Sequence, residues 1–381
     1  MNKLLAGVIV SSLVFSACAQ EKTTVSATRV MTQAKSMESI TIDDYFDFEW
    51  KELNDKVNAY VAKLTPEQRV AQLIMPAMGR LGQPEEKIRR WVSEEKIGGI
   101  LMLNGTVEQF TNWIEEFNNV VAKRGGVPFH YSADAEPSLV NRKITGSTTV
   151  LKASEITKLE EVTSVAQTIS KDLNSIGINY NFAPVSDMAS NGTVGYRGFG
   201  KVEENIVPFS LEFVKVSTAQ NVLTSIKHFP GHGLVTGDTH KALQTIDGKM
   251  KELPIFKTLI ENNVPSVMVG HIAVTNNAKY DTHGLPATVS PVIIDGLLRT
   301  ELGYKGLVVT DAMNMGGVVK VPNYSVKAIE AGVDILLMPL DTDKCYDELI
   351  TKYRSDKKFA EKVDKAATRI IRMKFCQKMI N

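Results

Sequence analysis

The chain has 381 residues, of which 43% are hydrophobic and 23% are charged. This composition suits a globular protein with one large core or two smaller ones. Lys and Arg total 44 against 43 Asp and Glu, for a formal net charge of +1. Because there is no basic excess to bind a phosphate backbone, nucleic acid is excluded as an expected partner.

The first eighteen residues have the pattern of an export signal. Lys3 is followed by an apolar run over 4–15 and then by Ser-Ala-Cys18. The run has the length of a signal-peptide core and is short for a membrane span. Since a Cys directly after Ser-Ala resembles a bacterial lipobox, we predict a signal peptide over 1–18 and lipidation of Cys18. The protein would then be exported and lipid-anchored to the cell envelope, in the periplasm or at the cell surface; simple secretion is the alternative.

The next segment, 19–45, is polar, rich in Thr, Ser and Lys, and has no apolar periodicity. It predicts a flexible tether that leads into a folded domain over 46–381. Beyond Cys18 the chain contains only Cys345 and Cys376, which is neither a disulfide framework nor a metal-binding spacing.

Within the domain, short apolar runs alternate with segments of helical character. We expect helices at 107–122, 155–176, 203–218, 291–302 and 326–331, and an amphipathic helix at 357–378. The expected strands are the eight runs at 72–76, 97–103, 127–132, 179–184, 223–227, 266–269, 306–310 and 334–338.

Near-continuous apolar strands that alternate with helices indicate parallel strands covered by helices. Eight such units predict an α/β fold of the (β/α)8 TIM-barrel type, as a single catalytic domain. An open, doubly wound sheet is the rival, but no Gly-x-Gly-x-x-Gly follows the first strand. In a barrel, functional side chains lie where the strands end.

Asp311 directly follows the run 306–310, so its carboxylate is expected at that edge. An Asp at a strand-to-helix turn also serves well as a helix N-cap. The position alone leaves both interpretations open.

A dense cluster of polar residues follows the run 223–227. It contains His228 and His232, and then Asp238 and His240. Three His and one Asp suggest zinc, and the first two His have the spacing of a His-Glu-x-x-His motif. However, the Pro-Gly pair between them would break the required helix, and the Glu is missing. We therefore predict no metal and no cofactor.

The same loop favours proton transfer. Its glycines allow unusual backbone angles and movement, and Asp238 is near enough in sequence to orient the imidazole of His240. A His can give a proton to a leaving oxygen and later take one from water, a contribution of about 10²- to 10⁴-fold. Solvated surface His residues are the alternative and explain the cluster poorly. A serine hydrolase lacks support, because no Gly-x-Ser-x-Gly elbow is present.

With these residues, the chain resembles glycoside hydrolase family 3 and, within it, the β-N-acetylhexosaminidase branch, which includes enzymes that recycle peptidoglycan fragments. The resemblance runs from Leu64 to Pro339. It is carried by the cluster at 227–240 and by the segments 285–290, 297–299, 302–303 and 306–313.

The resemblance implies a retaining, exo-acting β-N-acetylglucosaminidase that acts on cell-wall or related glycans through a covalent glycosyl-enzyme. Asp311 would be the nucleophile and His240 the acid/base, with Asp238 as its partner. Retaining glycosidases usually employ two carboxylates. Because a neutral His repels an anionic acceptor less than a Glu would, phosphorolysis is a second hypothesis.

The resemblance also implies a set of sugar-binding side chains near strand ends, where charged groups suit recognition of hydroxyls. Asp187 is expected to be a structural carboxylate that holds the Arg197 loop. The sugar-binding set comprises Asp134, Arg142, Arg197, Lys227, His228, Met268 and His271.

One departure from the family lies beside these residues. After Asp134-x-Glu136 the family usually has Gly-Gly, whereas this chain has Pro137 and Ser138. Two glycines, which tolerate many backbone conformations, are replaced by a proline with a fixed φ and by a serine. This changes the loop and bears on substrate preference.

Other functions stay open at this point. A glycan-binding lipoprotein with weakened catalysis has no need of Asp238, His240 and Asp311 together. A metal-dependent hydrolase predicts loss of activity with a chelator. β-Glucosidases and β-xylosidases usually take their acid/base from a second domain, which is not expected after the barrel. The expected partners are an oligosaccharide or muropeptide substrate and, through the lipid anchor only, the membrane; the sequence does not indicate an oligomeric state.

Overall fold

Parallel strand pairs connect segments that are far apart in the chain. In the computed structural model, which describes residues 35–380, β1 (Ile74–Met75) pairs with β14 (Leu336–Leu337), and β11 (Ser266–Val269) lies between β9 (Ile226–Phe229) and β13 (Leu307–Thr310). A five-stranded sheet has the order β2-β3-β5-β7-β8. Its strands are Ala77–Met78, Gly99–Met102, His130–Ala133, Tyr180–Asn181 and Leu223–Thr224.

At two places a single residue separates one short strand from the next. Pro76 separates β1 from β2, and Ser225 separates β8 from β9. Single backbone hydrogen bonds link the separate ladders, for example from Thr310 N to the carbonyl of Ile335 at 3.0 Å. Each of the eight predicted runs contains strand residues with a parallel neighbour, so the α/β class is confirmed. The ladder itself is interrupted and does not form one continuous closed sheet.

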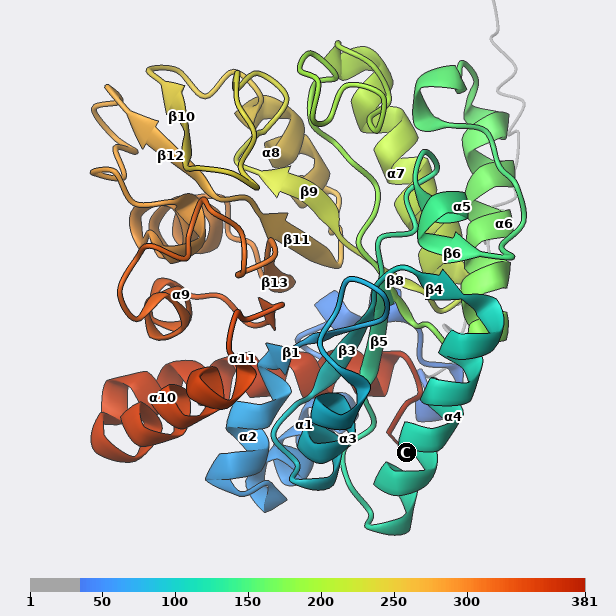
Figure 1. Cartoon of the computed structure of the whole chain (residues 1–381), viewed down its shortest axis with the longest axis vertical. Coiled ribbons are helices and arrows are strands. Elements are labelled where there is room, and N and C mark those ends of the chain that lie inside the picture. Colours follow the sequence, from blue (N-terminus) through green and yellow to red (C-terminus); the bar gives the residue numbers. More distant parts are fainter. Residues whose placement is uncertain (1–34, 381) are drawn as a thin grey trace, which may run out of the picture. The chain divides into compact units, whose positions relative to one another are not determined.

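Helices lie around the outside of the strands (Figure 1). At the start of α4 (Val107–Lys123), Thr106 and Gln109 form a reciprocal capping box, with both contacts at 3.1 Å. The buried residues of this helix recur at helical spacing and face the strands: Phe110, Ile114, Phe117 and Val121. The α-helices are α1 (Lys51–Lys63), α2 (Pro66–Gln72), α3 (Glu85–Ser93), α4 (Val107–Lys123), α5 (Val140–Lys143), α6 (Leu159–Ile176), α7 (Glu203–Ala219), α8 (Leu253–Glu261), α9 (Tyr324–Ala331), α10 (Thr342–Ser355) and α11 (Lys357–Cys376); η5 (Val292–Glu301) is π-helical.

Two short strand pairs lie outside the predicted runs. β4 (Gly105–Thr106) pairs with β6 (Ile144–Thr145), and β10 (Gln244–Asp247) pairs with β12 (Ile272–Thr275). The second pair matters for function because β10 follows the His240 loop directly and anchors its end beside β12.

The folded unit begins earlier than predicted. Residues from Met37 onward belong to it, and the short 3-10 helices η1 (Met37–Ser39) and η2 (Ile42–Phe46) fall within the predicted tether. Tyr45 is fully buried, and its carbonyl accepts a hydrogen bond from Arg372 Nε of α11 at 2.7 Å. The domain boundary predicted at 46 is therefore too late, because residues 37–45 are packed rather than a free tether.

The predicted signal peptide and Cys18 lie outside the described residues. Over residues 35–380, none of the helices has the length and apolarity that a bilayer span requires.

Candidate active site

Side chains from several strands converge on one cavity of about 590 Å³. Asp134 directly follows β5, Lys227 lies in β9, Met268 in β11, and Asp311 directly follows β13. Because the strands are parallel, their carboxyl ends meet at the same edge, and all the predicted catalytic and sugar-binding residues except His271 line the cavity there.

Two cations and two carboxylates form a buried cluster at one side of the cavity. Arg197 donates to both carboxylate oxygens of Glu136, at 2.8 and 2.7 Å. The ammonium of Lys227 lies 2.5 Å from Glu136 Oε1 and 3.0 Å from Asp134 Oδ1. Lys143, at the end of α5, lies 3.6 Å from the other oxygen of Asp134. Each charge has an opposite partner, as burial requires.

The charges of this cluster hold one another in the ionised state. Burial alone would raise the pKa of Asp134, but Lys227 and Lys143 lower it well below the usual range. Burial opposes ionisation of Glu136 as well, and Arg197 and Lys227 lower its pKa. The cluster therefore presents fixed donors and acceptors, the kind of surface that recognises sugar hydroxyls.

Ser138, part of the departure from the family pattern, links the cluster to its surroundings. Its hydroxyl donates to the carbonyl of Tyr196 at 2.7 Å and accepts from the N–H of Ala153 at 3.0 Å. The segment that carries Arg197 is thus held twice from the same loop, by Glu136 and by Ser138.

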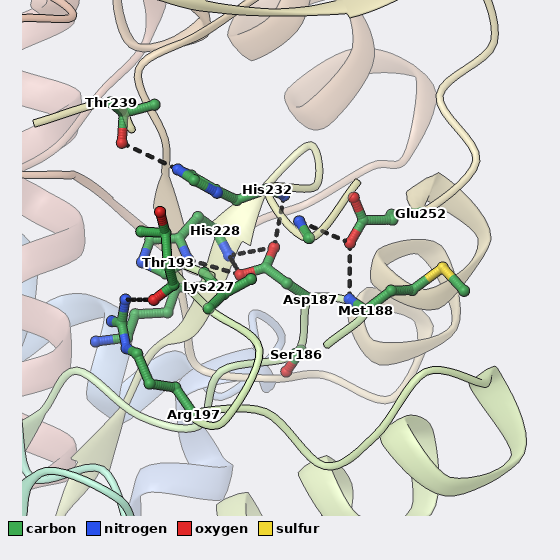
Figure 2. Close-up of polar contacts among 12 residues, drawn as sticks. Ser186, Asp187, Met188, Thr193, Arg197, Lys227, His228, His232, Thr239 and Glu252 are labelled. Carbon is green, nitrogen blue, oxygen red and sulfur yellow. Dashed lines mark hydrogen bonds and ion pairs between the residues drawn. The ribbon is translucent and has the colours of Figure 1, made fainter. Parts of the chain in front are cut away.

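A buried carboxylate organises the loop after Lys227. Asp187 accepts the backbone N–H groups of His228, at 3.0 Å to each oxygen, and of His232 at 2.8 Å, and it lies 2.6 Å from His228 Nδ1 (Figure 2). Burial would raise the pKa of Asp187, but contact with His228 lowers it. Asp187 is structural, as expected, yet its side chain binds this loop; the predicted contact with the Arg197 loop is wrong.

His232 is also held in place. Its Nε2 lies 3.0 Å from Thr239 Oγ1. His228 contacts Asp187 through Nδ1, and His232 contacts Thr239 through Nε2. Each ring therefore has one nitrogen engaged by a neighbouring side chain. Among residues 35–380, no three His, Cys, Asp or Glu side chains are grouped as a metal ion requires.

Asp238 and His240 form the predicted pair. Nδ1 of His240 lies 2.8 Å from Asp238 Oδ1, and the same oxygen accepts the backbone N–H of His240 at 2.9 Å. Burial would raise the pKa of Asp238, but these hydrogen bonds from His240 lower it. The His240 side chain is 64% exposed, so its remaining nitrogen, Nε2, is open to a ligand.

Asp311 lines the same cavity as this pair. Its Oδ1 accepts the N–H of Ala312 at 2.8 Å, and Oδ2 makes no hydrogen bond to a described residue. Burial would raise its pKa, but His228 and the hydrogen bond from the N–H of Ala312 lower it, which keeps the carboxylate ionised. One oxygen is held while the other is free, as a nucleophile requires.

His271 does not line the cavity as predicted. It is fully buried, and burial lowers its pKa, so the ring is neutral. The neutral ring donates from Nε2 to the carbonyl of Ala312 at 2.9 Å and accepts at Nδ1 from the hydroxyl of Thr288 at 2.9 Å. Its position supports the backbone next to Asp311.

Arg142 lines the cavity and is exposed, with no side-chain hydrogen bond or ion pair to a described residue. Glu136 is the main residue that sequence reasoning did not assign. Its place in the sequence pointed to the site, because Glu136 lies two residues after Asp134 and near the same strand end. Its partners, Arg197 and Lys227, come from distant segments and could not be predicted. Lys143 was not assigned either, and Ser138 was expected only to change this loop, without the contact to Tyr196.

The chain is similar to known sugar-processing proteins over most of its length. Residues 65–373 match the model of the glycosyl hydrolase family 3 N terminal domain. The chain is 38% identical over 197 residues, 47% of its length and 33% of the relative's, to beta-hexosaminidase A of Pseudoalteromonas piscicida. It is 26% identical to beta-hexosaminidase LpqI of Mycobacterium tuberculosis, over 82% of this chain and 84% of that protein.

Solved structures agree with the sequence relatives. A family 3 beta-N-acetylglucosaminidase from Paenibacillus superposes with a TM-score of 0.76 at 30% identity, covering 83% of this chain and 63% of that one. A beta-N-acetylhexosaminidase from Beutenbergia cavernae gives a TM-score of 0.74 at 29% identity, covering 81% and 98%.

The chain is an α/β protein that belongs to glycosyl hydrolase family 3, because the family model matches it over residues 65–373. It spans about a third of the P. piscicida relative and 52% of a beta-N-acetylglucosaminidase/beta-glucosidase of Cellulomonas fimi.

Proposed function

We propose that this chain is a retaining exo-β-N-acetylglucosaminidase that removes terminal N-acetylglucosamine from cell-wall or related glycans. The observation that carries the proposal is the shared cavity: the Asp238–His240 pair and the ionised Asp311 line it together with Asp134, Arg197 and Lys227. Similarity to the beta-hexosaminidases and to the Paenibacillus and Beutenbergia structures supports the choice of sugar.

In the first step, an oxygen of Asp311 attacks the anomeric carbon while the bond from that carbon to the leaving oxygen breaks. His240 gives the proton on Nε2 to the leaving oxygen, because Nδ1 is engaged by Asp238. The Asp238 carboxylate stabilises the positive charge that His240 carries before transfer. The product is a glycosyl ester of Asp311 and a released alcohol.

In the second step, water attacks the anomeric carbon from the side that the alcohol left. Nε2 of His240 takes the proton from this water, and the ester bond to Asp311 breaks to regenerate the carboxylate. Two displacements at one carbon retain the configuration of the sugar.

Sugar binding is assigned to the charged cluster and its neighbours. Asp134, Lys227 and Arg197 would bind hydroxyls, with Arg142, His228 and Met268 completing the wall. The buried His271 would act only through the backbone of Ala312. We further propose that the eight strand positions together form a (β/α)8 barrel, which the linking hydrogen bonds between ladders support.

The proposal includes the cellular location of the protein. A lipid anchor on Cys18 would hold the domain at the bacterial envelope and bring it to peptidoglycan fragments. Globomycin, which blocks lipoprotein signal cleavage, is expected to leave a larger precursor in cells; Cys18→Ala is expected to release the protein from the membrane fraction.

Phosphorolysis is the second candidate, because the proton-transfer group is a His and not a carboxylate. In addition, Arg142 is exposed in the cavity wall and uncommitted to any described residue, so a cation is available there for an anionic acceptor. Phosphate would replace water in the second step and yield a sugar 1-phosphate.

A panel of 4-nitrophenyl sugars, with and without phosphate, tests both candidates. We expect 4-nitrophenol from the N-acetylglucosaminide and free sugar as the product in phosphate-free buffer. Sugar 1-phosphate, formed faster as phosphate increases, would identify a phosphorylase instead. If no sugar in the panel is cleaved above the level of Asp311→Ala while glycans still bind, the chain is a glycan-binding protein. A chelator is expected to have no effect.

A further inference from the structure

Glu252 is a buried carboxyl group for which the reaction above has no role. It directly precedes α8 and is 3% exposed. Its Oε1 accepts the backbone N–H of Met188 at 2.7 Å and of Gly233 at 3.1 Å, and its Oε2 accepts the N–H of Leu234 at 3.1 Å. Figure 2 shows the contact between Glu252 and Met188, next to Asp187.

The three donors belong to two different segments of the active site. Met188 begins the segment 188–197, which ends at Arg197. Gly233 and Leu234 lie at the root of the loop that carries Asp238 and His240. One carboxyl group therefore joins the sugar-binding segment to the proton-transfer loop.

A second contact joins the same two segments. Nδ2 of Asn191 donates to the carbonyl of His232 at 2.6 Å and to that of Val235 at 2.9 Å. Its two acceptors, His232 and Val235, lie on either side of the Gly233 and Leu234 amides that Glu252 binds, so the same turn is held to the segment 188–197 at two points.

Two glycines make the close approach to Glu252 possible. A Cβ atom at Gly233 would lie 1.7 Å from the carbonyl oxygen of Met188 and 2.8 Å from Glu252 Oε1. At Gly231, where φ is +129°, a Cβ atom would lie 2.6 Å from the Cβ of Glu252. Real side chains do not tolerate such distances, so the loop follows this path only with glycine at both positions.

The surroundings of Glu252 favour the protonated, uncharged form of its carboxyl group. Burial and then the neighbouring carboxylate of Asp187 raise the pKa of Glu252 to about 8. Asp187 itself stays ionised through its contact with His228. A protonated carboxyl group retains acceptor capacity on both oxygens, so it keeps the backbone contacts without adding a second charge beside Asp187.

We propose that Glu252 is a positioning residue that fixes the root of the His240 loop against the segment bearing Arg197, so that the acid/base group is delivered to the bound sugar. This role rests on the proposed function. Glu252 touches neither substrate nor the reacting atoms; it acts through the backbone of residues 188, 233 and 234.

The role predicts a defect that depends on the leaving group. The 2,4-dinitrophenolate group of an aryl glycoside leaves without a proton from an acid. The leaving sugar oxygen of the disaccharide chitobiose needs the proton from His240. In Glu252→Ala we expect kcat/KM for the disaccharide to fall about tenfold or more, and that for the dinitrophenyl glycoside to change less than about threefold. A general loss of folded protein would lower both equally.

Hydrogen exchange of the backbone amides gives a readout that does not depend on activity. The amides of Met188, Gly233 and Leu234 are expected to exchange faster in Glu252→Ala. Glu252→Gln keeps the side-chain volume and one acceptor, but turns a donor towards Leu234, so faster exchange is expected at Leu234 in particular. This variant serves in place of the alanine variant if the latter does not fold.

Glu261→Gln is the matched control, since Glu261 lies at the other end of α8 with its side chain 60% exposed. It should match the wild type in exchange and in both substrates. Wild-type exchange at residues 233 and 234 in the folded Glu252 variants would overturn the proposal, as would equal losses on both substrates. If the wild type cleaves neither substrate, the proposed function fails while the exchange data still decide the role of Glu252.

Discussion

The ring of His240 contacts Asp238 through Nδ1, at 2.8 Å, and so leaves Nε2 for proton exchange with the substrate. The contact lies on a loop that is rooted by buried contacts at one end and by the β10–β12 strand pair at the other.

Asp238→Asn tests this pairing. The Asn oxygen can still accept from Nδ1, but the charge that stabilises protonated His240 is gone. We expect kcat for chitobiose to fall about 10- to 100-fold, with a smaller change for the dinitrophenyl glycoside. Steady-state kinetics on both substrates measure the difference.

The matched control is Asp281→Asn, because Asp281 and His283 form another His–Asp pair two residues apart, at 3.5 Å, outside the cavity lining. Wild-type kinetics are expected for it. If Asp238→Asn also has wild-type kinetics on chitobiose, the proton passes through another group.

Asp311 is expected to carry the covalent intermediate. A slow fluorinated aryl glycoside should add the mass of one sugar to the protein, on the peptide that contains Asp311, and Asp311→Ala should show no adduct and lose activity by about 10⁴-fold or more. Peptide mass spectrometry checks the site. An adduct on a different residue would remove Asp311 from the role of nucleophile.

Much of this site was predictable because the fold makes strand ends converge. Asp134, Lys227 and Asp311 each lie in or directly after an apolar run, and parallel strands bring such positions to one edge. The Asp238–His240 contact was predictable because it is local. The partners of Glu136 and Asp187 were not, because they depend on which distant segment packs against each carboxylate.

The errors in the prediction have a similar cause. His271 stands near a strand end like the cavity residues, yet its ring packs under Ala312, and sequence alone does not distinguish the two directions. Residues 37–45 are polar overall, but Ile40, Ile42 and Tyr45 become buried against the domain. The strand pair β10–β12 was missed because β10 alternates half-buried and exposed residues and lacks an apolar run.

Ser138 is predicted to affect binding of the sugar more than its chemistry. Removing its hydroxyl in Ser138→Gly leaves the carbonyl of Tyr196 and the N–H of Ala153 without this partner, and loosens the segment that carries Arg197. We expect KM for the 4-nitrophenyl N-acetylglucosaminide to rise several-fold with kcat within about twofold, and stability to fall by about 1–2 kcal/mol.

Ser138→Thr retains the hydroxyl and should restore most of the lost affinity, whereas Ser138→Ala should resemble the glycine variant. If the glycine, alanine and threonine variants all have the same KM, the hydroxyl of residue 138 does not position Arg197.

Lys374 is expected to make stability depend on pH. Its ammonium is fully buried in α11, where it donates to Gln72 Oε1 at 2.7 Å and to the carbonyl of Gly98 at 3.3 Å, and burial lowers its pKa to about 7. In the unfolded chain the pKa returns to about 10.4. Between these values the unfolded state binds the proton and the folded state does not, so this group makes the free energy of unfolding rise with pH.

Lys374→Met removes the titration and keeps an apolar side chain of similar length. The variant should be more stable than the wild type near pH 7, and its advantage should shrink by about 2 kcal/mol between pH 7 and pH 9. Urea unfolding at several pH values measures the difference. Lys365→Met, at an exposed position of the same helix, should give a difference that does not change with pH. If the Lys374→Met difference is equally constant, the buried ammonium ionises as it does in water, and its burial is not a source of pH-dependent stability.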